Sequence, residues 1–314
     1  MNFLKMLVIN LSLLLFSSCG MGLKVTKLTP GNASSPQVAA SFITSWDTSK
    51  TGNVANNDDV TITLPLHSSC TYNFIVNWGD GSPLETITEW NDSKKTHTYS
   101  TPGKKTVEIQ GTLGCLSFDA DGDQVSDGDA SKLVDVVQWG SNQWQTMEAM
   151  FFGADQLISF SATDIPDLSQ VTNMSRTFKF SRLFNGDILN WNTSQVVIMD
   201  EMFRGAVSFN QNIGDWNTSQ VQVMRSMFQG AIAFNQDIGG WDTSSILLME
   251  SMFAHTANFN QDIRNWDTSH VTNMDHMFEL ALNFSQDLSG WNVNSVFGHN
   301  DFNLGNSLLT PPLF

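Results

Sequence analysis

The sequence predicts a mixed fold, in which a β-sandwich is followed by an α/β solenoid of 25-residue repeats. Three features lead to this prediction: tryptophan recurs every 25 residues, apolar residues follow each tryptophan at helical spacing, and short β-type runs precede the repeats. A period between about 20 and 50 residues is typical of solenoids, in which each unit buries its apolar face only against its neighbours. We therefore expect a long binding surface rather than a catalytic pocket.

The repeated apolar residues predict one short helix per repeat. The tryptophans are Trp191, Trp216, Trp241, Trp266 and Trp291, and a methionine follows the first four by eight residues, at Met199, Met224, Met249 and Met274. Val or Ile stands five residues after each tryptophan, and Phe stands twelve residues after the first four. Such spacings place the side chains on one helix face. Burying each of them contributes ~1.5–3 kcal/mol, so we expect these columns to be core rather than a cofactor site.

The sequence also predicts how each helix begins and ends. Thr193-Ser194 and its copies are typical N-cap residues, and Gly205 and Gly230 stand where a left-handed residue would end the helix. The stretch that follows, 209–216 in one copy, is too short for a second helix, so we expect one short strand there.

The repeat extends beyond its regular copies with changes. Trp139 begins an earlier copy, and Pro166 takes the tryptophan position 27 residues later, which is a two-residue insertion. At the other end the pattern decays, with His299 in the methionine column. Decay at both ends is expected of capping repeats.

Two polar columns leave two interpretations open. Their members are Asn185, Asn210, Asn235 and Asn260, and Asp187, Asn212, Asp237, Asp262 and Asp287. Like charges repeated along a ladder repel unless they accept hydrogen bonds or meet a cation. Either one column ties down loop backbone while the other faces water, or the columns form an acidic strip that binds a ligand.

The N-terminus predicts export and lipidation. Lys5 precedes an apolar run at 7–16 that is too short to span a bilayer, which is typical of a signal peptide. Residues 15–19, Leu-Phe-Ser-Ser-Cys, resemble a bacterial lipobox, which implies removal of residues 1–18 and a diacylglycerol on Cys19. An ordinary signal peptide without lipid is the alternative. Lipid chains anchor a protein at a membrane without making it integral.

Charge and cysteine content agree with an envelope location. By resemblance to the sorting rule of proteobacterial lipoproteins, Gly20 rather than Asp after the cysteine favours the outer membrane, where we expect the protein to be surface-exposed, and 19–37 is expected to be a tether. The formal net charge of −16 argues against nucleic acid and against direct binding to anionic lipid. In an oxidising compartment Cys70 and Cys115 form an even pair, so we expect a disulfide.

Residues 38–113 are expected to form the sandwich. They contain three short β-type runs, at 60–64, 72–78 and 105–109. The segments 78–82, Trp-Gly-Asp-Gly-Ser, and 97–99, His-Thr-Tyr, look like the signature of polycystic-kidney-disease (PKD) domains, which implies an immunoglobulin-like β-sandwich. We interpret Asp80 as a structural turn residue and His97 as half-buried, rather than as a catalytic pair.

The segment 114–131 is predicted to be an acidic linker. It carries Asp119, Asp121, Asp123, Asp127 and Asp129. Carboxylate oxygens suit calcium, and the alternation of the first three resembles the start of a calcium loop. An EF-hand loop would need glycine and glutamate where the chain has Gln124 and Ala130. A solvated linker and a calcium site both stay open, and calcium is the one cofactor that the sequence suggests.

The repeat motifs carry a second resemblance. Written as Met-x-x-Met-Phe, Phe-Asn-Gln-Asp-Ile and Trp-Asp-Thr-Ser-x-Val, the repeat at 132–314 resembles that of BspA-type leucine-rich-repeat surface proteins of bacteria. The resemblance implies a leucine-rich-repeat-like solenoid with terminal caps. It also implies adhesion to a protein or glycan ligand on a host or neighbouring cell.

The sequence leaves two alternative functions. One is a calcium-stiffened structural envelope lipoprotein without a specific ligand, and the other is a surface carbohydrate-active enzyme. The sequence contains no Gly-x-Ser-x-Gly, His-Glu-x-x-His or Gly-rich phosphate motif, so we expect no enzyme and no catalytic residues.

Overall fold

The computed structural model describes residues 40–50, 60–119, 122 and 129–314. Its regular elements are β1 (Phe42–Asp47), β2 (Thr61–Thr63), β3 (Tyr72–Asn77), β4 (Glu85–Ile87), the 3-10 helix η1 (Ser93–Lys95), β5 (Thr96–Thr98), β6 (Lys104–Leu113), the 3-10 helix η2 (Ala130–Lys132) and β7 (Leu133–Gln138). The other described residues lie in turns, bends, isolated bridges or irregular backbone, so these ranges contain no α-helix.

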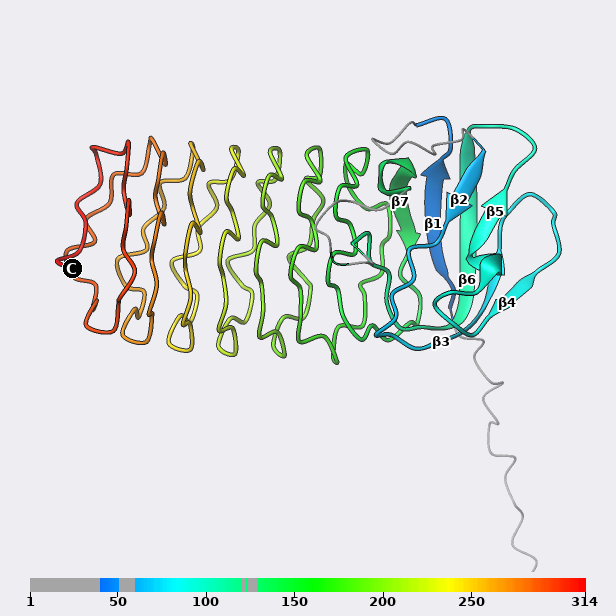
Figure 1. Cartoon of the computed structure of the whole chain (residues 1–314), viewed down its shortest axis with the longest axis horizontal. Coiled ribbons are helices and arrows are strands. Elements are labelled where there is room, and N and C mark those ends of the chain that lie inside the picture. Colours follow the sequence, from blue (N-terminus) through cyan, green and yellow to red (C-terminus); the bar gives the residue numbers. More distant parts are fainter. Residues whose placement is uncertain (1–39, 51–59, 120–121, 123–128) are drawn as a thin grey trace, which may run out of the picture. The chain divides into compact units, whose positions relative to one another are not determined.

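The strands form two antiparallel sheets. One has five strands in the order β4-β3-β6-β1-β7, and the other pairs β2 with β5 (Figure 1). Along β1, Phe42, Thr44 and Trp46 are buried while the residues between them are half-buried. Because burial alternates along the strand with a period of two residues, one face of the sheet packs against the core.

The last strand joins the sheet to the repeats. β7 lies inside the range predicted for the repeats, yet it pairs antiparallel with β1. Just beyond it, the rings of Phe42 and Trp144 meet edge to face with centroids 5.1 Å apart. The backbone N–H of Gln145 donates to the carbonyl of Gly114 at 2.9 Å. One apolar core therefore continues from the sheets into the first coils.

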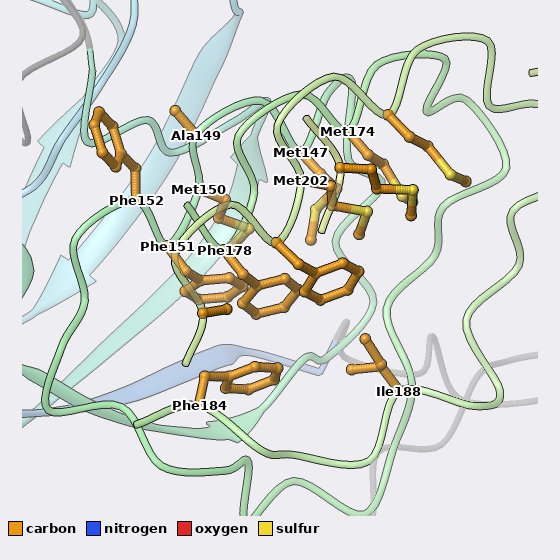
Figure 2. Close-up of a cluster of buried hydrophobic side chains, with 14 of the residues drawn as sticks. Met147, Ala149, Met150, Phe151, Phe152, Met174, Phe178, Phe184, Ile188 and Met202 are labelled. Carbon is orange, nitrogen blue, oxygen red and sulfur yellow. The ribbon is translucent and has the colours of Figure 1, made fainter. Parts of the chain in front are cut away.

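From Gln143 onward the chain forms stacked coils, seen in Figure 1 from green to red. Successive coils are joined by single parallel bridges, at Gln143–Asp167, Asn173–Ile198, Ile198–Val223, Val223–Leu248, Leu248–Asn273 and Asn273–Gly298. Equivalent side chains stack on one another, as the rings of Phe151 and Phe178 do in Figure 2, with centroids 5.2 Å apart. The 25-residue period therefore brings equivalent side chains together in one continuous apolar core.

The segment predicted as a helix is a run of turns. In 199–206 the backbone N–H groups alternate between two directions: those of Glu201, Phe203 and Gly205 donate to the next coil at 2.8–2.9 Å, and those of Met202, Arg204 and Ala206 donate three residues back. An α-helix would direct all of these groups along its own axis, toward carbonyls four residues back, and none sideways to the next coil. The predicted fold class, an immunoglobulin-like β-sandwich followed by a leucine-rich-repeat-like α/β solenoid, is therefore wrong, because the described chain is nearly all-β and has no helix for an α/β repeat.

Left-handed residues explain why no helix propagates. Glu201 has φ +54° and Gly205 has φ +69°, and the equivalent residues of other coils, including His255 and Leu280, are also left-handed. Each such residue reverses the right-handed sense of its neighbours. The chain therefore turns back every few residues and offers alternate N–H groups to the next coil.

The predicted caps and strands also differ from the structure. The Thr193 hydroxyl donates to the Asn217 carbonyl of the next coil at 3.0 Å, and the Ser194 N–H donates to Asn192 Oδ1 at 3.1 Å. These residues therefore make a turn and an inter-coil bond, not a helix cap. No strand forms in 209–216, and the parallel bridge lies instead at Ile198, immediately before the run of turns.

Candidate binding surface

The tryptophan and methionine columns lie inside the stack. The five repeat tryptophans are 4–5% exposed and the four methionines are fully buried. The indole N–H of Trp216 donates to the carbonyl of Ile188 in the preceding coil at 3.1 Å, and Trp241, Trp266 and Trp291 repeat this bond. Trp216, Trp241, Trp266, Trp291 and the four methionines therefore bind neighbouring coils together and are not available to a ligand.

The asparagine column ties coil to coil. The Oδ1 atom of Asn235 accepts the backbone N–H of Asn260 at 2.9 Å and the Gln261 side-chain amide at 2.9 Å. The N–H of Asn235 itself donates to Asn210 Oδ1 at 2.9 Å. These bonds give the column a structural role in the described coils.

The neighbouring aspartate column faces solvent and shapes turns. Each member accepts the backbone N–H two residues ahead through Oδ1. Asp262 also accepts two hydrogen bonds from the Arg264 guanidinium, at 2.9 and 2.7 Å, and these bonds lower the pKa of Asp262 to about 2. The geometry thus explains this column without a bound cation.

Charged side chains also form ion pairs along the stacked runs of turns. Lys179, whose side chain is 2% exposed, donates to Glu201 at 2.8 Å, and Arg204 pairs with the same carboxylate. Burial tends to raise the pKa of Glu201, but the bonds from Lys179 and Arg204 outweigh it, so the pKa is lowered. Arg225 donates to Asp200 at 2.9 Å. This face therefore mixes both signs of charge.

Exposed apolar side chains lie at the end of the run of turns and just beyond it in several coils. We name this set the apolar edge, and it comprises Phe180, Leu183, Val207, Ile232, Leu280 and Leu282. Val207, Ile232 and Leu282 stand sixteen residues after their tryptophans and are 38%, 46% and 52% exposed, with Ala257 in the coil between. The Ala233 N–H donates to the Val207 carbonyl at 3.1 Å, which holds successive coils in register here. Exposed apolar residues that gather on one part of a surface often mark interaction sites.

Sequence reasoning missed the apolar edge. The available signal was an apolar residue sixteen positions after the tryptophan, outside every column that the helical pattern assigned to the core. That signal could not be used without knowing which positions of the coil face solvent.

The aspartates of the linker divide into two groups. Asp119 is buried and pairs with Arg176, which also pairs with Glu148. Asp129 pairs with Lys132 at 2.7 Å and accepts the N–H of Thr63. The remaining members, Asp121, Asp123 and Asp127, lie outside the described residues. Within the ranges that are described, no cluster of three or more His, Cys, Asp or Glu side chains is arranged to hold a metal.

Other predicted residues of the first domain have structural partners. Cys70 and Cys115 form a disulfide with their Cα atoms 5.9 Å apart. Asp80 accepts the Ser82 N–H at 3.0 Å and lies 2.8 Å from His97 Nε2, and these contacts lower the pKa of Asp80. His97 also stacks on Trp78. The Asp80–His97 contact thus stabilises a turn against the sheet.

Predictions for the N-terminus fall on residues that are not described. The signal peptide at 1–18, the lipidated Cys19 and the tether at 19–37 all lie outside the described ranges. Among the described residues, no helix has the length and apolar character needed to cross a bilayer.

Comparisons with known proteins assign the repeats to a family. A search of curated proteins and a search of solved structures found no match. A family model described as "Mycoplasma protein of unknown function, DUF285" matches residues 145–253 and 234–302, which together span half of the chain. The protein therefore belongs to the DUF285 family.

Proposed function

We propose that this protein is a lipid-anchored bacterial surface protein whose repeat stack binds a protein or glycan on another cell, as an adhesin. The apolar edge is the observation that carries this proposal. The core and asparagine columns are occupied by contacts between coils, whereas Val207, Ile232 and Leu282 expose apolar surface to solvent on three of four successive coils. The predicted lipid on Cys19 would hold that surface at the cell envelope. The binding role is not enzymatic.

The size of the apolar edge sets the expected effect. Full burial of a Val, Leu or Ile side chain contributes ~1.5–3 kcal/mol, and these three side chains keep roughly half of their surface exposed. Covering them with a partner would contribute about 1 kcal/mol each. Three such contributions correspond to roughly a hundredfold in dissociation constant.

The test replaces the apolar edge without touching the core. The full-length protein is displayed on bacteria as wild type and as the triple variant Val207→Asp, Ile232→Asp, Leu282→Asp, and adhesion to host cells and to surfaces coated with matrix protein is counted. All three positions are exposed, so we expect the melting temperature to change little. Adhesion is expected to fall at least tenfold.

A matched control adds the same three carboxylates elsewhere on the coils. The substitutions Gln195→Asp, Gln220→Asp and His270→Asp fall at exposed positions four residues after their tryptophans. This control should adhere as the wild type does. Equal adhesion by the wild type and the apolar-edge variant would refute the proposed surface.

A further inference from the structure

A hollow interrupts the tryptophan column near the start of the stack. It measures about 180 Å³ and lies between Trp139 and Trp191, in the coil where Pro166 replaces the tryptophan. The Phe160 ring fills part of the gap, with its centroid 5.3 Å from that of Trp139 and 6.2 Å from that of Trp191. At ~30 Å³ per water molecule, the hollow has room for about six waters or one small ring.

The hollow contains a hydrogen-bond donor that the regular coils do not leave free. In four later coils the indole N–H donates to the residue three positions before the preceding tryptophan, at 3.0–3.2 Å. For Trp191 the equivalent residue is Thr163, which lines the hollow but does not accept this bond. Among the described residues, the Trp191 indole N–H therefore has no hydrogen-bond partner. The two-residue insertion falls between Trp139 and this position, where it breaks the regular period.

The rim of the hollow supplies acceptors. Asp164 is held in place because it accepts the N–H of Trp139 at 3.1 Å and that of Gly140 at 2.7 Å. Asp187 accepts the N–H of Leu189 at 2.9 Å. Each carboxylate offers about four acceptor sites, so both retain capacity for a ligand. No lysine or arginine lines the hollow.

We propose that this hollow is a subsite for one sugar ring of a glycan, with hydroxyl groups that donate to Asp164 and Asp187 and accept from the Trp191 indole. A hydroxyl both donates and accepts, whereas an ammonium group only donates and leaves the indole N–H unpaired. The aromatic walls suit the C–H faces of a sugar ring, and a small pocket with a few convergent polar groups is a typical ligand site. The inference rests on the proposed adhesive function, because it names a glycan as the ligand class.

The test measures binding of single sugars to the full chain. Glucose, galactose, mannose and N-acetylglucosamine are titrated separately by calorimetry, with N-acetyl-lysine methylamide as a cationic probe. Trp191→Phe keeps the aromatic ring and removes the N–H, and Asp187→Asn removes one charged acceptor. Each is expected to weaken sugar binding about tenfold, the loss of one good hydrogen bond.

Trp241→Phe is the matched control. It also removes an indole N–H, but one that already donates to the Ile213 carbonyl at 3.0 Å, so sugar affinity should stay unchanged. Sugar binding that weakens in Trp191→Phe and Asp187→Asn, but not in Trp241→Phe, supports the subsite. Preference for the lysine probe, or no binding of any sugar at millimolar concentration, overturns it.

The same variants separate this inference from the proposed function. If no sugar binds while adhesion still depends on the apolar edge, the subsite is wrong and the adhesin proposal stands. If a sugar binds as expected while the apolar-edge variant adheres as well as the wild type, the proposed adhesive surface is wrong and the subsite stands.

Discussion

At the left-handed turn residues, the effect of a glycine substitution on stability depends on whether the backbone forms turns or a helix. Ser226 has φ +52°, and its N–H donates to the Glu250 carbonyl of the next coil at 2.8 Å. Its hydroxyl makes no hydrogen bond to any described residue. Ser226→Gly therefore removes one side chain from a left-handed position without breaking a known contact.

The magnitude follows from two opposing effects. A non-glycine residue in the left-handed region costs ~1–2 kcal/mol, which glycine avoids. Glycine also frees the unfolded chain, which costs roughly 0.5–1 kcal/mol. The net gain is about 0.5–1 kcal/mol, or a rise of about 1–4 °C in melting temperature for a domain of this size. Ser226→Ala keeps the β-carbon in the same strained place and should gain nothing.

A helix would produce the opposite order. In a helix interior alanine is the best residue and glycine costs ~1 kcal/mol relative to it. Urea unfolding of the wild type, Ser226→Gly and Ser226→Ala, followed by tryptophan fluorescence, measures the difference directly. Ser251, with φ +55° in the next coil, is a second position at which Ser251→Gly should repeat the gain. A stabilising alanine together with a destabilising glycine would refute the run of turns.

Three further predictions concern an inter-coil hydrogen bond, a partly buried carboxylate and the disulfide. Asn235→Ala should cost about 1–2 kcal/mol of unfolding free energy because two hydrogen bonds are lost, whereas Asn235→Asp keeps the acceptor oxygen and should cost less in urea unfolding. Burial raises the pKa of Glu250 above its ordinary 4.5, so its ionisation destabilises the fold at higher pH and has no cost below that ordinary value. Glu250→Gln should therefore raise the melting temperature at pH 7 and leave it nearly unchanged at pH 3.5. Reduction of Cys70–Cys115 should cost about 4 kcal/mol in the chain-entropy account, measured as a lower midpoint of urea unfolding with reductant, because the bond closes a loop of 45 residues.

The sequence predicted which side chains are buried better than it predicted the backbone that buries them. Met199, Met202 and Phe203 are fully buried, as their spacing indicates. Spacings of three and four residues, however, bring side chains to one side in a run of tight turns as well as in a helix. Nothing about Glu201 in the sequence marks a left-handed residue, and only the glycine at Gly205 hinted at one. We interpreted that glycine as the end of a helix, although it is one of two left-handed residues within each run of turns.

Long-range pairing also limited the prediction. β7 pairs with β1 across about 90 residues, and no local pattern shows that a strand from the repeat range completes the sheet. The polar columns can be identified in the sequence, but the residues to which they form hydrogen bonds cannot. A side chain such as Asn235 bonds a residue 25 positions away, so its role depends on how the coils stack.

Repetition itself indicates where function should be sought in this chain. A column that is the same in every coil, such as the tryptophans or asparagines, is explained by contacts that each coil makes with the next. A binding site for a particular ligand needs surface that these contacts do not use. Two such places among the described residues are the apolar edge, where Ala257 interrupts larger apolar residues, and the coil of Pro166, where the period itself is broken. Replacing Pro166 with tryptophan, and deleting two residues to restore the period, should therefore close the hollow and abolish sugar binding. The apolar edge and its adhesion should remain.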